Sequence, residues 1–462
     1  MKRSLLWLLG LLGTLVLIWL GATAYVGYLL EDHYRQQLRL QAERFDFLGI
    51  EVRHGLYERG VFGSRAETVY VDAESGRTLC RLRHDLRHGP LFPSRRLIGL
   101  AAIDSRLILP AGLRREHLVL EGADHPLKAE SFMALDGFFI SRIKAPAAAW
   151  RADGGRLAWS PLHGRIELKQ GLRQKLSMDF ELSRLKGRTE NQSEGFAFEG
   201  MKLTAWNDQD PAGMNGTQEL TLDIHRAELL GDASARAAME SFSLTGQGSW
   251  SGGIMNSTTA VRLGSLKSSG IAVQQGALDL RTENVDRTAL QELQALQNAP
   301  EGAAQGRGTE RAAIRRVVKE ILQAAPSLEI SRLQFRTGNG TVRFQGMVAY
   351  RPVGSVPLGD TAELIRQCEA QAEIAVPRKL ALKAVSIALS LFKSFRLEGD
   401  RQSDGRDGHG SAAKQARQWL GALRAMGLID EEDGRYATSA GLQAGVLSVN
   451  GVRLMDLATM QE

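Results

Sequence analysis

The stretch KLSMDFELSRL, residues 175–185, decides how the central part of this chain folds. Its apolar residues Leu176, Met178, Phe180 and Leu182 alternate with polar ones. Because successive side chains of a β-strand point to opposite faces, this period of two predicts a strand with one apolar and one polar face.

The same alternation recurs on both sides of this stretch. It is seen in TLCRLRHDL at 78–86, LAAIDSRLIL at 100–109, EHLVLEG at 116–122, RIELKQG at 165–171, FAFEGMKLTAW at 196–206, ELTLDIHRAEL at 219–229, SFSLTGQGSW at 241–250, TAVRLGSL at 259–266 and IAVQQGALDLRT at 271–282. Glycine-containing turns separate these segments. Parallel strands would need helices between them, so the pattern favours an antiparallel meander or a long curved antiparallel sheet with one face covered.

Helices are predicted only in the last third of the body. The apolar stripe from Ile314 to Leu322 has helical spacing, and three leucines over 290–296 predict a shorter helix. The connection Gly338-Asn339-Gly340 predicts a β-hairpin, and strict alternation from Cys368 to Val376 predicts a further strand. The fold class is therefore mainly β with helices in the C-terminal third (α+β).

The N-terminus carries a run of 27 residues without charge, residues 4–30. A helix of that length reaches roughly 40 Å, more than the ~30 Å hydrocarbon core of a bilayer. Lys2 and Arg3 precede the run, and Glu31 and Asp32 follow it, which predicts a cytoplasmic N-terminus and an exported body. The rival interpretation is a cleaved signal peptide, because Ala22-Thr23-Ala24 resembles a cleavage site. The apolar run continues past that site, and we favour an uncleaved transmembrane anchor.

Composition changes along the chain predict five parts. Residues 1–30 form the transmembrane signal anchor, and residues 31–300 form a β-rich region that begins with a short amphipathic helix over 33–49. Residues 301–398 contain a helix and a β-hairpin. Residues 399–411, GDRQSDGRDGHGS, form a flexible polar linker, and residues 412–462 form a C-terminal helix and hairpin.

Several spaced motifs resemble one family. Near the N-terminus YERGVFGS contributes Tyr57, Arg59, Gly60, Phe62 and Ser64. The following basic strand ends in His88, Gly89 and Pro90, and the segment near the C-terminus contributes Gly427, Asn450 and Gly451. Together with the apolar N-terminus, these pieces resemble the YdgA-like family of bacterial envelope proteins of unknown function. The resemblance implies a single-pass inner-membrane protein with an extended β-rich periplasmic body, and it carries over no catalytic or cofactor residue.

These motif residues also have structural interpretations. Gly60 lets the chain bend between the helix exit and the first strand, and Pro90 ends a strand. Gly427 lies where a helix C-cap is expected, and Asn450-Gly451 is a turn dipeptide in the last hairpin. We expect all eleven motif positions to serve the fold.

Charge and motif content exclude several classes of function. With 58 Lys+Arg against 52 Asp+Glu, the chain is too balanced for a dedicated nucleic-acid binder. Nine arginines between residues 77 and 115 form the strongest local asymmetry. They indicate either a basic face for anionic lipid or polymer, or the solvated outer face of a sheet, which we favour. No nucleotide-binding loop, hydrolase elbow or zinc-protease motif is present.

The remaining candidates for chemistry are histidines and cysteines. His84 and His88 are four residues apart, a spacing that suits a metal pair on a helix but spans about 13 Å on a strand. We therefore expect no metal site and no cofactor. Cys80 and Cys368 lie in predicted strands, either as a disulfide or as two free thiols.

Three hypotheses follow. The first is a membrane-anchored, non-catalytic envelope protein whose long sheet binds a lipid or another envelope component. The second is an assembly or structural factor that acts by protein–protein contact, with a dimer among the states left open. The third, which we favour least, is a periplasmic hydrolase, which would need a serine, a histidine and a carboxylate converging in a pocket.

Overall fold

The computed structural model describes residues 2–459 except 46–48, 93–96, 113–116, 153, 172, 191–193, 232–235, 269–270, 298–305 and 387–407. Two compact units make up the chain, residues 1–213 with 220–236 and residues 214–219 with 237–462. We call them unit 1 and unit 2. Among the described residues, 23 strands are assigned to one antiparallel sheet, and β4 and β5 form a separate pair. The mainly β fold is thereby confirmed.

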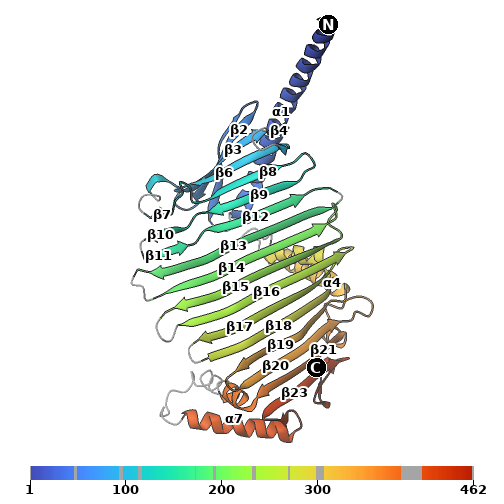
Figure 1. Ribbon diagram of the computed structural model, residues 1–462. Helices are drawn as coiled ribbons and strands as arrows, with labels where there is room; N and C mark the ends of the chain where they lie inside the picture. The colour runs from blue at the N-terminus through green and yellow to red at the C-terminus, as the bar shows by residue number, and fades with distance from the viewer. Residues whose placement is uncertain are drawn as a thin grey trace. The chain divides into compact units, whose positions relative to one another are not determined.

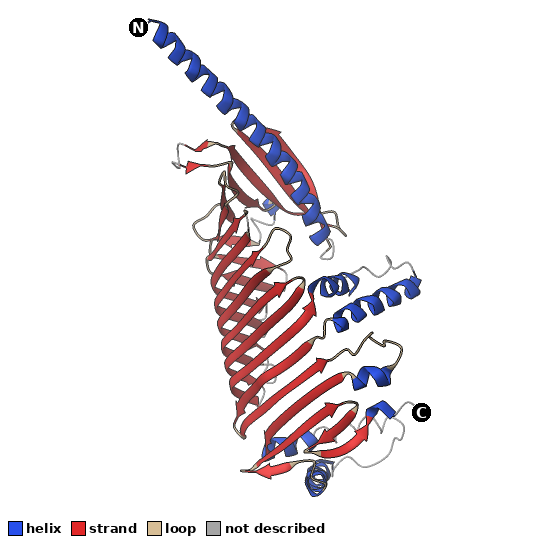
Figure 2. Ribbon diagram, turned by 90° about the vertical axis from the view of Figure 1, so that its right-hand side faces the viewer, coloured by secondary structure: helices blue, strands red, loops and turns tan. Residues whose placement is uncertain are grey.

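Unit 1 begins with a single long helix, α1 (Lys2–Phe45). The predicted amphipathic helix over 33–49 is the C-terminal part of α1, which lies against the first strands of the unit (Figure 2). A stripe of α1 with helical spacing, including Thr23, Val26 and Leu30, is buried. Val26 and Leu30 pack with Ala66, Leu86 and Ala101 of the sheet to form a core cluster.

The strands of unit 1 follow in nearly sequential order (Figure 1). Neighbours in the sheet are β1, β2, β3, β6, β8, β9, β12, β13 and β14, and a second branch, β7, β10 and β11, joins the later half of β13. Their bounds are β1 (Ile50–Arg59), β2 (Gly63–Asp72), β3 (Thr78–His88), β4 (Leu91–Phe92), β5 (Leu97–Ile98), β6 (Ala101–Ile108), β7 (Leu118–Leu120), β8 (Lys128–Met133), β9 (Phe139–Ala145), β10 (Ala148–Ala152), β11 (Gly155–Trp159), β12 (Leu162–Lys169), β13 (Gln174–Thr189), β14 (Gly195–Gln209) and β15 (Gly216–Leu230).

Unit 2 is a simpler meander. Its sheet order is β16, β17, β18, β19, β20, β21, β23, β24 and β25, with β22 paired to β23. The bounds are β16 (Ala237–Ser251), β17 (Ile254–Ser268), β18 (Ile271–Asp286), β19 (Ser327–Thr337), β20 (Gly340–Tyr350), β21 (Cys368–Pro377), β22 (Asp430–Glu432), β23 (Arg435–Gln443), β24 (Val446–Val449) and β25 (Val452–Asp456). The hairpin predicted at Gly338-Asn339 is confirmed, because β19 and β20 pair up to Thr337 and Gly340.

Helices of unit 2 connect its strands. They include α3 (Arg287–Gln297), α4 (Gly306–Gln323), α5 (Thr361–Arg366), a helical segment over 378–386 and α7 (Gly408–Ala425); a 3-10 turn, η4 (Leu457–Thr459), follows the last strand. Helices α3 and α4 correspond to the two predicted from apolar spacing. Asp360 caps α5, since its carboxylate accepts a hydrogen bond from the Glu363 backbone N–H at 2.9 Å.

The structure differs from the sequence-based expectations at two places. Residues 50–59 form a strand, β1, that we did not predict, so Gly60 lies in the turn between β1 and β2 and not between the helix and the first strand. Residues 408–411, assigned to the linker, open α7, while residues 399–407 lie outside the described part.

The sequence predicts a membrane span over residues 4–30. Among the residues that the structure describes, no helix combines the length and the apolar character needed to cross a bilayer. The side chains of residues 1–18 lie outside the described part, so the anchor stays a prediction.

Candidate functional site

Eight of the eleven motif residues converge at one end of unit 1. They lie in β1, in the turn before β2, at the start of β2 and at the end of β3. These segments meet because Ser64 pairs with Leu86 in the sheet and the His88 backbone N–H donates to the Phe62 carbonyl at 2.9 Å. The eight motif residues are therefore close together in the fold, and α1 packs over them.

Ser64 and His88 form a buried hydrogen-bonded pair at this place. The Ser64 Oγ atom lies 2.9 Å from Nε2 of His88, and Nδ1 of the same ring lies 3.1 Å from the Val61 carbonyl oxygen. A carbonyl oxygen can only accept, so Nδ1 carries the proton and Nε2 accepts from the serine hydroxyl. Burial lowers the pKa of His88, which keeps the ring neutral.

A serine hydrogen-bonded to a histidine is also the start of a hydrolase triad, but the surroundings do not suit that chemistry. The second ring nitrogen faces a carbonyl and not a carboxylate. Helix α1 covers the ring so closely that a β-carbon at Gly27 would lie 2.5 Å from Cε1 of His88. The close packing of α1 leaves no space for a substrate over Ser64 and His88. Their geometry suits a packing contact between the helix and the sheet.

Three further motif side chains contact α1 along its length. The Tyr57 hydroxyl donates to the Gly27 carbonyl at 3.5 Å, and burial raises the pKa of Tyr57. The Arg59 guanidinium lies 3.4 Å from the Glu31 carboxylate. The Phe62 ring lies 5.4 Å from the ring of Trp19, centroid to centroid. Together with His88, these contacts fix the helix against the sheet.

The remaining motif residues of this end shape the backbone. At Gly89 the N–H donates to the Leu100 carbonyl at 2.7 Å, and a β-carbon would lie 1.7 Å from the Gly99 oxygen, so only glycine fits. The Gly89–Pro90 peptide bond is cis, and the Pro90 carbonyl accepts from the Gly99 N–H at 3.0 Å. The Gly60 N–H donates to the Gly63 carbonyl at 2.8 Å and closes the β1–β2 turn.

His84 does not join His88 in a metal site. Its Nδ1 lies 2.7 Å from the Ser105 hydroxyl, and burial lowers the pKa of His84 to about 4. Within the described ranges no three His, Cys, Asp or Glu side chains are grouped so that they could hold a metal ion. Cys80 on β3 and Cys368 on β21 are both free thiols.

The described strand arginines of the arginine-rich segment, Arg81, Arg83, Arg87 and Arg106, lie on the face of the sheet opposite to α1. Arg81 pairs with Glu67 at 3.2 Å, and Arg87 approaches Asp104 at 3.7 Å. Asp85 lies 3.6 Å from Arg65 and 3.9 Å from Arg83. Arg95, Arg96, Arg114 and Arg115 lie outside the described residues. Arg81 and Arg87 thus form ion pairs across strands, and Arg83 pairs within β3, as on a solvated outer face.

Near the C-terminus, Gly427 and the Asn450-Gly451 turn have the backbone geometry that the motifs suggest. Gly427 has a positive φ of 71°, and the N–H groups of Gly427 and Leu428 donate to Arg424 and Leu423 at 2.9 Å, a Schellman cap of α7. Asn450 and Gly451, with φ of 46° and 77°, form the two-residue turn between β24 and β25.

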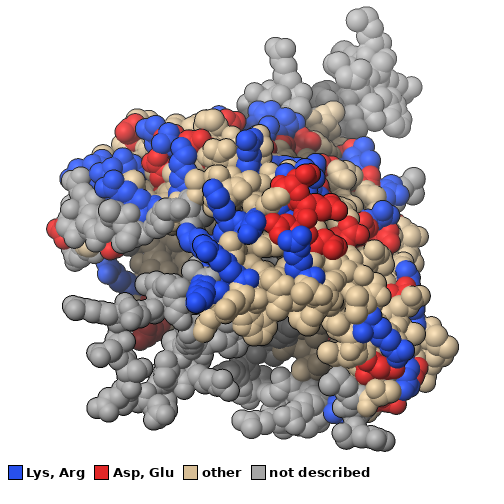
Figure 3. Space-filling view, turned by 90° about the horizontal axis from the view of Figure 1, so that it is seen from below, with Lys and Arg blue, Asp and Glu red and all other residues tan. Residues whose placement is uncertain are grey.

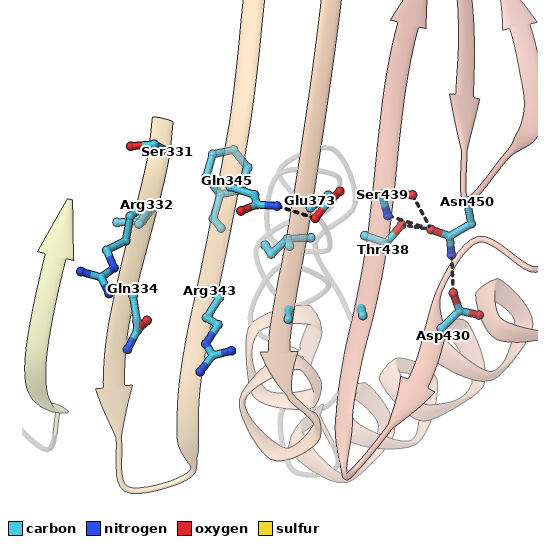
Figure 4. Close-up of a pocket in the computed structure, with 15 residues that line it drawn as sticks. Ser331, Arg332, Gln334, Arg343, Gln345, Glu373, Asp430, Thr438, Ser439 and Asn450 are labelled. Atoms are coloured by element: carbon cyan, nitrogen blue, oxygen red, sulfur yellow. Dashed lines mark hydrogen bonds between the residues drawn. The ribbon is translucent and has the colours of Figure 1, made fainter. Parts of the chain in front are cut away.

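Asn450 also closes one side of an open groove of about 690 Å³ in unit 2 (Figure 4). Its side-chain oxygen accepts from the backbone N–H of Ser439 at 2.7 Å, and its amide donates to Asp430 at 3.2 Å. Gln345 donates to Glu373 at 2.6 Å farther along the groove. Arg332, Gln334 and Arg343 line the other side (Figure 4). The sequence singled out Asn450 as turn chemistry only and did not suggest this groove.

Apolar residues alternate with these polar ones along the same strands and form an apolar face, and three of them, Leu333, Phe344 and Ile374, also line the groove. Leu278, Leu333, Phe344 and Ile374 lie directly opposite one another on β18 to β21. A second row contains Leu328 and Val348. Leu328, Val348 and Ile374 are 46%, 52% and 38% exposed, respectively. This part of the apolar face is therefore open to solvent.

Unit 1 has an apolar groove of its own, of about 590 Å³. Trp150, Leu157 and Phe196 line it from β10, β11 and β14, together with Leu229 and Leu230 of β15. Gly187 lies between Leu157 and Phe196 in the register, and a β-carbon there would overlap the Phe196 ring at 2.5 Å. The missing side chain leaves room for this aromatic ring next to the Gly187 backbone.

Charged side chains on the face seen in Figure 3 are mixed, with acidic and basic groups next to one another. In unit 2, for example, Glu431 pairs with both Arg378 at 3.0 Å and Arg424 at 2.7 Å. Such alternation of sign is typical of a solvated protein surface.

Comparison with known proteins gives a family and no function. A family model described as a bacterial protein of unknown function, DUF945, matches residues 1–455. Neither the curated proteins nor the solved structures contain a match to the chain. The bacterial source and the unknown function implied by the sequence resemblance are confirmed in this form. The YdgA-like name and the envelope location are not part of the match.

Proposed function

Since the chain belongs to the DUF945 family of bacterial proteins of unknown function, we propose from its own geometry that it is a non-catalytic, lipid-binding protein of the bacterial envelope. In this proposal α1 anchors the chain in the inner membrane, with its N-terminus in the cytoplasm and its body in the periplasm. The apolar face of the sheet binds the acyl chains of phospholipids.

One observation carries the proposal. On β19 to β21 the apolar face has bulky aliphatic side chains that are about half exposed, with polar residues on the other face of the same strands. Exposed apolar rows of this kind favour burial against another apolar surface. Acyl chains suit them because the rows offer area and few polar groups to orient a more specific ligand. The apolar groove of unit 1 supports the same class of ligand.

Photo-crosslinking tests this proposal. The full-length protein, extracted in detergent, is exchanged against phosphatidylglycerol that carries a diazirine on one acyl chain, and the crosslinked residues are mapped by mass spectrometry. We expect crosslinks on Val348 and its neighbours of the apolar face. Val348→Glu should lower the yield there, because it places a charge among the acyl chains.

Met347→Glu is the matched control. It introduces the same charge one residue away, on the opposite face of β20, and should leave the yield unchanged. Equal losses in both variants, or crosslinks confined to the polar face, would overturn the proposal. A protein that copurifies in fixed stoichiometry in place of lipid would support the second hypothesis, an assembly factor.

A further inference from the structure

The length of α1 that packs on the sheet limits how far unit 1 can stand from a membrane. Among the described side chains of α1, Trp19 packs on Phe62, and Val26 and Leu30 pack on the sheet farther along the helix. Of the apolar run 4–30, only residues 4–18 precede these contacts. Fifteen helical residues span roughly 22 Å, about 8 Å less than the hydrocarbon core. The missing length must come from residues that already lie against the sheet.

The turns at this end of unit 1 carry large apolar side chains. The β1–β2 turn holds Val61 and Phe62, the β4–β5 pair holds Ile98, and the β8–β9 turn holds Leu135. Val61, Ile98 and Leu135 are 48%, 61% and 55% exposed. The register places the β1–β2 turn, the β4–β5 pair and the β8–β9 turn at the same end, because His88 pairs with Ala101, and Ala101 pairs with Met133.

Figures 1 and 2 show that this is also the end from which α1 leaves unit 1 toward its N-terminus. Tyr25 and Tyr28 are exposed on the side of α1 that faces away from the sheet. Tyrosine side chains favour the boundary between lipid and water. The turn between β2 and β3, at the opposite end of these strands, contains Glu74, Ser75 and Arg77 and no large apolar residue.

We propose that the turns carrying Val61, Phe62, Ile98 and Leu135 form a membrane-contact surface that sits in the interface of the bilayer entered by α1. This inference rests on the membrane anchor of the proposed function and goes beyond it, since a flexible tether would leave the body free in the periplasm. The continuous helix brings the turns to the lipid, and their apolar side chains then gain burial on contact.

Site-directed fluorescence tests the contact. In a Cys80→Ser, Cys368→Ser background, the full chain carries a single cysteine at Val61→Cys or, as the matched control, at Glu74→Cys, labelled with NBD. Both proteins are reconstituted into vesicles of phosphatidylethanolamine and phosphatidylglycerol, and flotation is measured first. We expect blue-shifted emission at position 61, quenched by bromine on the acyl chains, and aqueous emission at position 74.

The outcomes separate this inference from the anchor. Proteins that float but show aqueous emission at both positions overturn the membrane contact and leave the anchor intact. Proteins that do not float overturn both. If the cysteine background fails to fold, hydrogen–deuterium exchange of the unaltered chain provides the second measurement. Residues 60–63 and 134–138 should gain protection in vesicles relative to detergent, and residues 73–77 should not; equal exchange in the three turns overturns the contact.

Discussion

The two units differ in whether the apolar face of their strands is covered. At β1 to β3 of unit 1, helix α1 covers it, and the covered surface contains Ser64, Thr68 and His88, all buried. At β19 to β21 of unit 2 the apolar face is aliphatic and about half exposed. Both arise from the same alternation of residues along a strand. The alternation of apolar and polar residues along a strand therefore produces an apolar face, but it does not determine whether a helix covers that face.

The covered face differs by its polar contacts. A hydrogen bond from Tyr57 to the Gly27 carbonyl, at 3.5 Å, and one between the hydroxyls of Tyr34 and Thr68, at 2.9 Å, fix the position and rotation of α1 on the sheet. Each bond contributes only about 1 kcal/mol, but a buried polar group without its partner is costly, so alternative positions of the helix are excluded. The open rows of unit 2 have no such contacts among their aliphatic side chains, which suits ligands that need no single orientation.

The largest expected effect comes from Gly89→Ala. The new β-carbon would overlap the Gly99 backbone oxygen, which no side-chain rearrangement can relieve. We expect a loss of ~3 kcal/mol or more in the free energy of unfolding of unit 1. Urea denaturation in detergent, followed by circular dichroism, measures it. Gly421→Ala in α7, where a β-carbon meets no atom within 4 Å, is the control. Equal stability of the two variants would contradict the packing described.

Acid should weaken the covered face next. The pKa of His84 falls from 6.5 to about 4 on folding, because burial disfavours its charged form. Below pH 6.5 the unfolded chain therefore binds a proton at His84 that the folded chain does not bind. The free energy of unfolding falls as the pH drops toward 4. The loss amounts to at most ~3 kcal/mol. His84→Gln removes this titration and should flatten the dependence of stability on pH; parallel curves for variant and parent would refute the assignment.

A smaller effect is expected from Tyr57→Phe, which removes one hydroxyl and keeps the ring. We expect a loss of about 1 kcal/mol and faster proteolysis near the end of α1, because the helix loses a hydrogen bond to the sheet. Tyr25→Phe, whose hydroxyl is on an exposed side chain, should change neither. If both variants had the same stability and the same rate of proteolysis, the packing of α1 on the sheet would not depend on the Tyr57 hydrogen bond.

The smallest effect on stability is expected from Val348→Lys. Half of this side chain is already in water, so the free energy of unfolding should change by less than ~0.5 kcal/mol. Ala66→Lys makes the same kind of change on the covered face, where the side chain is 1% exposed, and should detach α1. Similar losses in the free energy of unfolding for the two variants would contradict the difference in exposure between the two faces.

Much of the sheet is predictable from the sequence, since segments such as 175–185 and 368–376 alternate strictly. Strand β1 is not, because a register shift between His54 and Tyr57 interrupts its alternation. The contact of Ser64 with His88 also escapes prediction. The two residues lie in neighbouring strand segments, but only the register, which depends on tertiary pairing, brings them together.

The packing of α1 on the sheet cannot be predicted from the sequence for a different reason. All residues from 4 to 30 lack charge, so the stripe that contacts the sheet cannot be told apart from a lipid-facing surface by hydropathy. Among the described side chains of that run, Gly27 marks a close approach, because a β-carbon there would overlap the His88 ring. Its partner, His88, is 61 positions away and is recognisable only in three dimensions.

The meander of unit 2 has a consequence for how such a protein can change its size. From β16 to β21 each strand pairs with its neighbours along the sheet and reverses direction at each step. Insertion or loss of one hairpin, two strands together, preserves both the direction of the following strands and the identity of their faces. The sheet can therefore lengthen or shorten by whole hairpins during evolution while its apolar surface stays continuous.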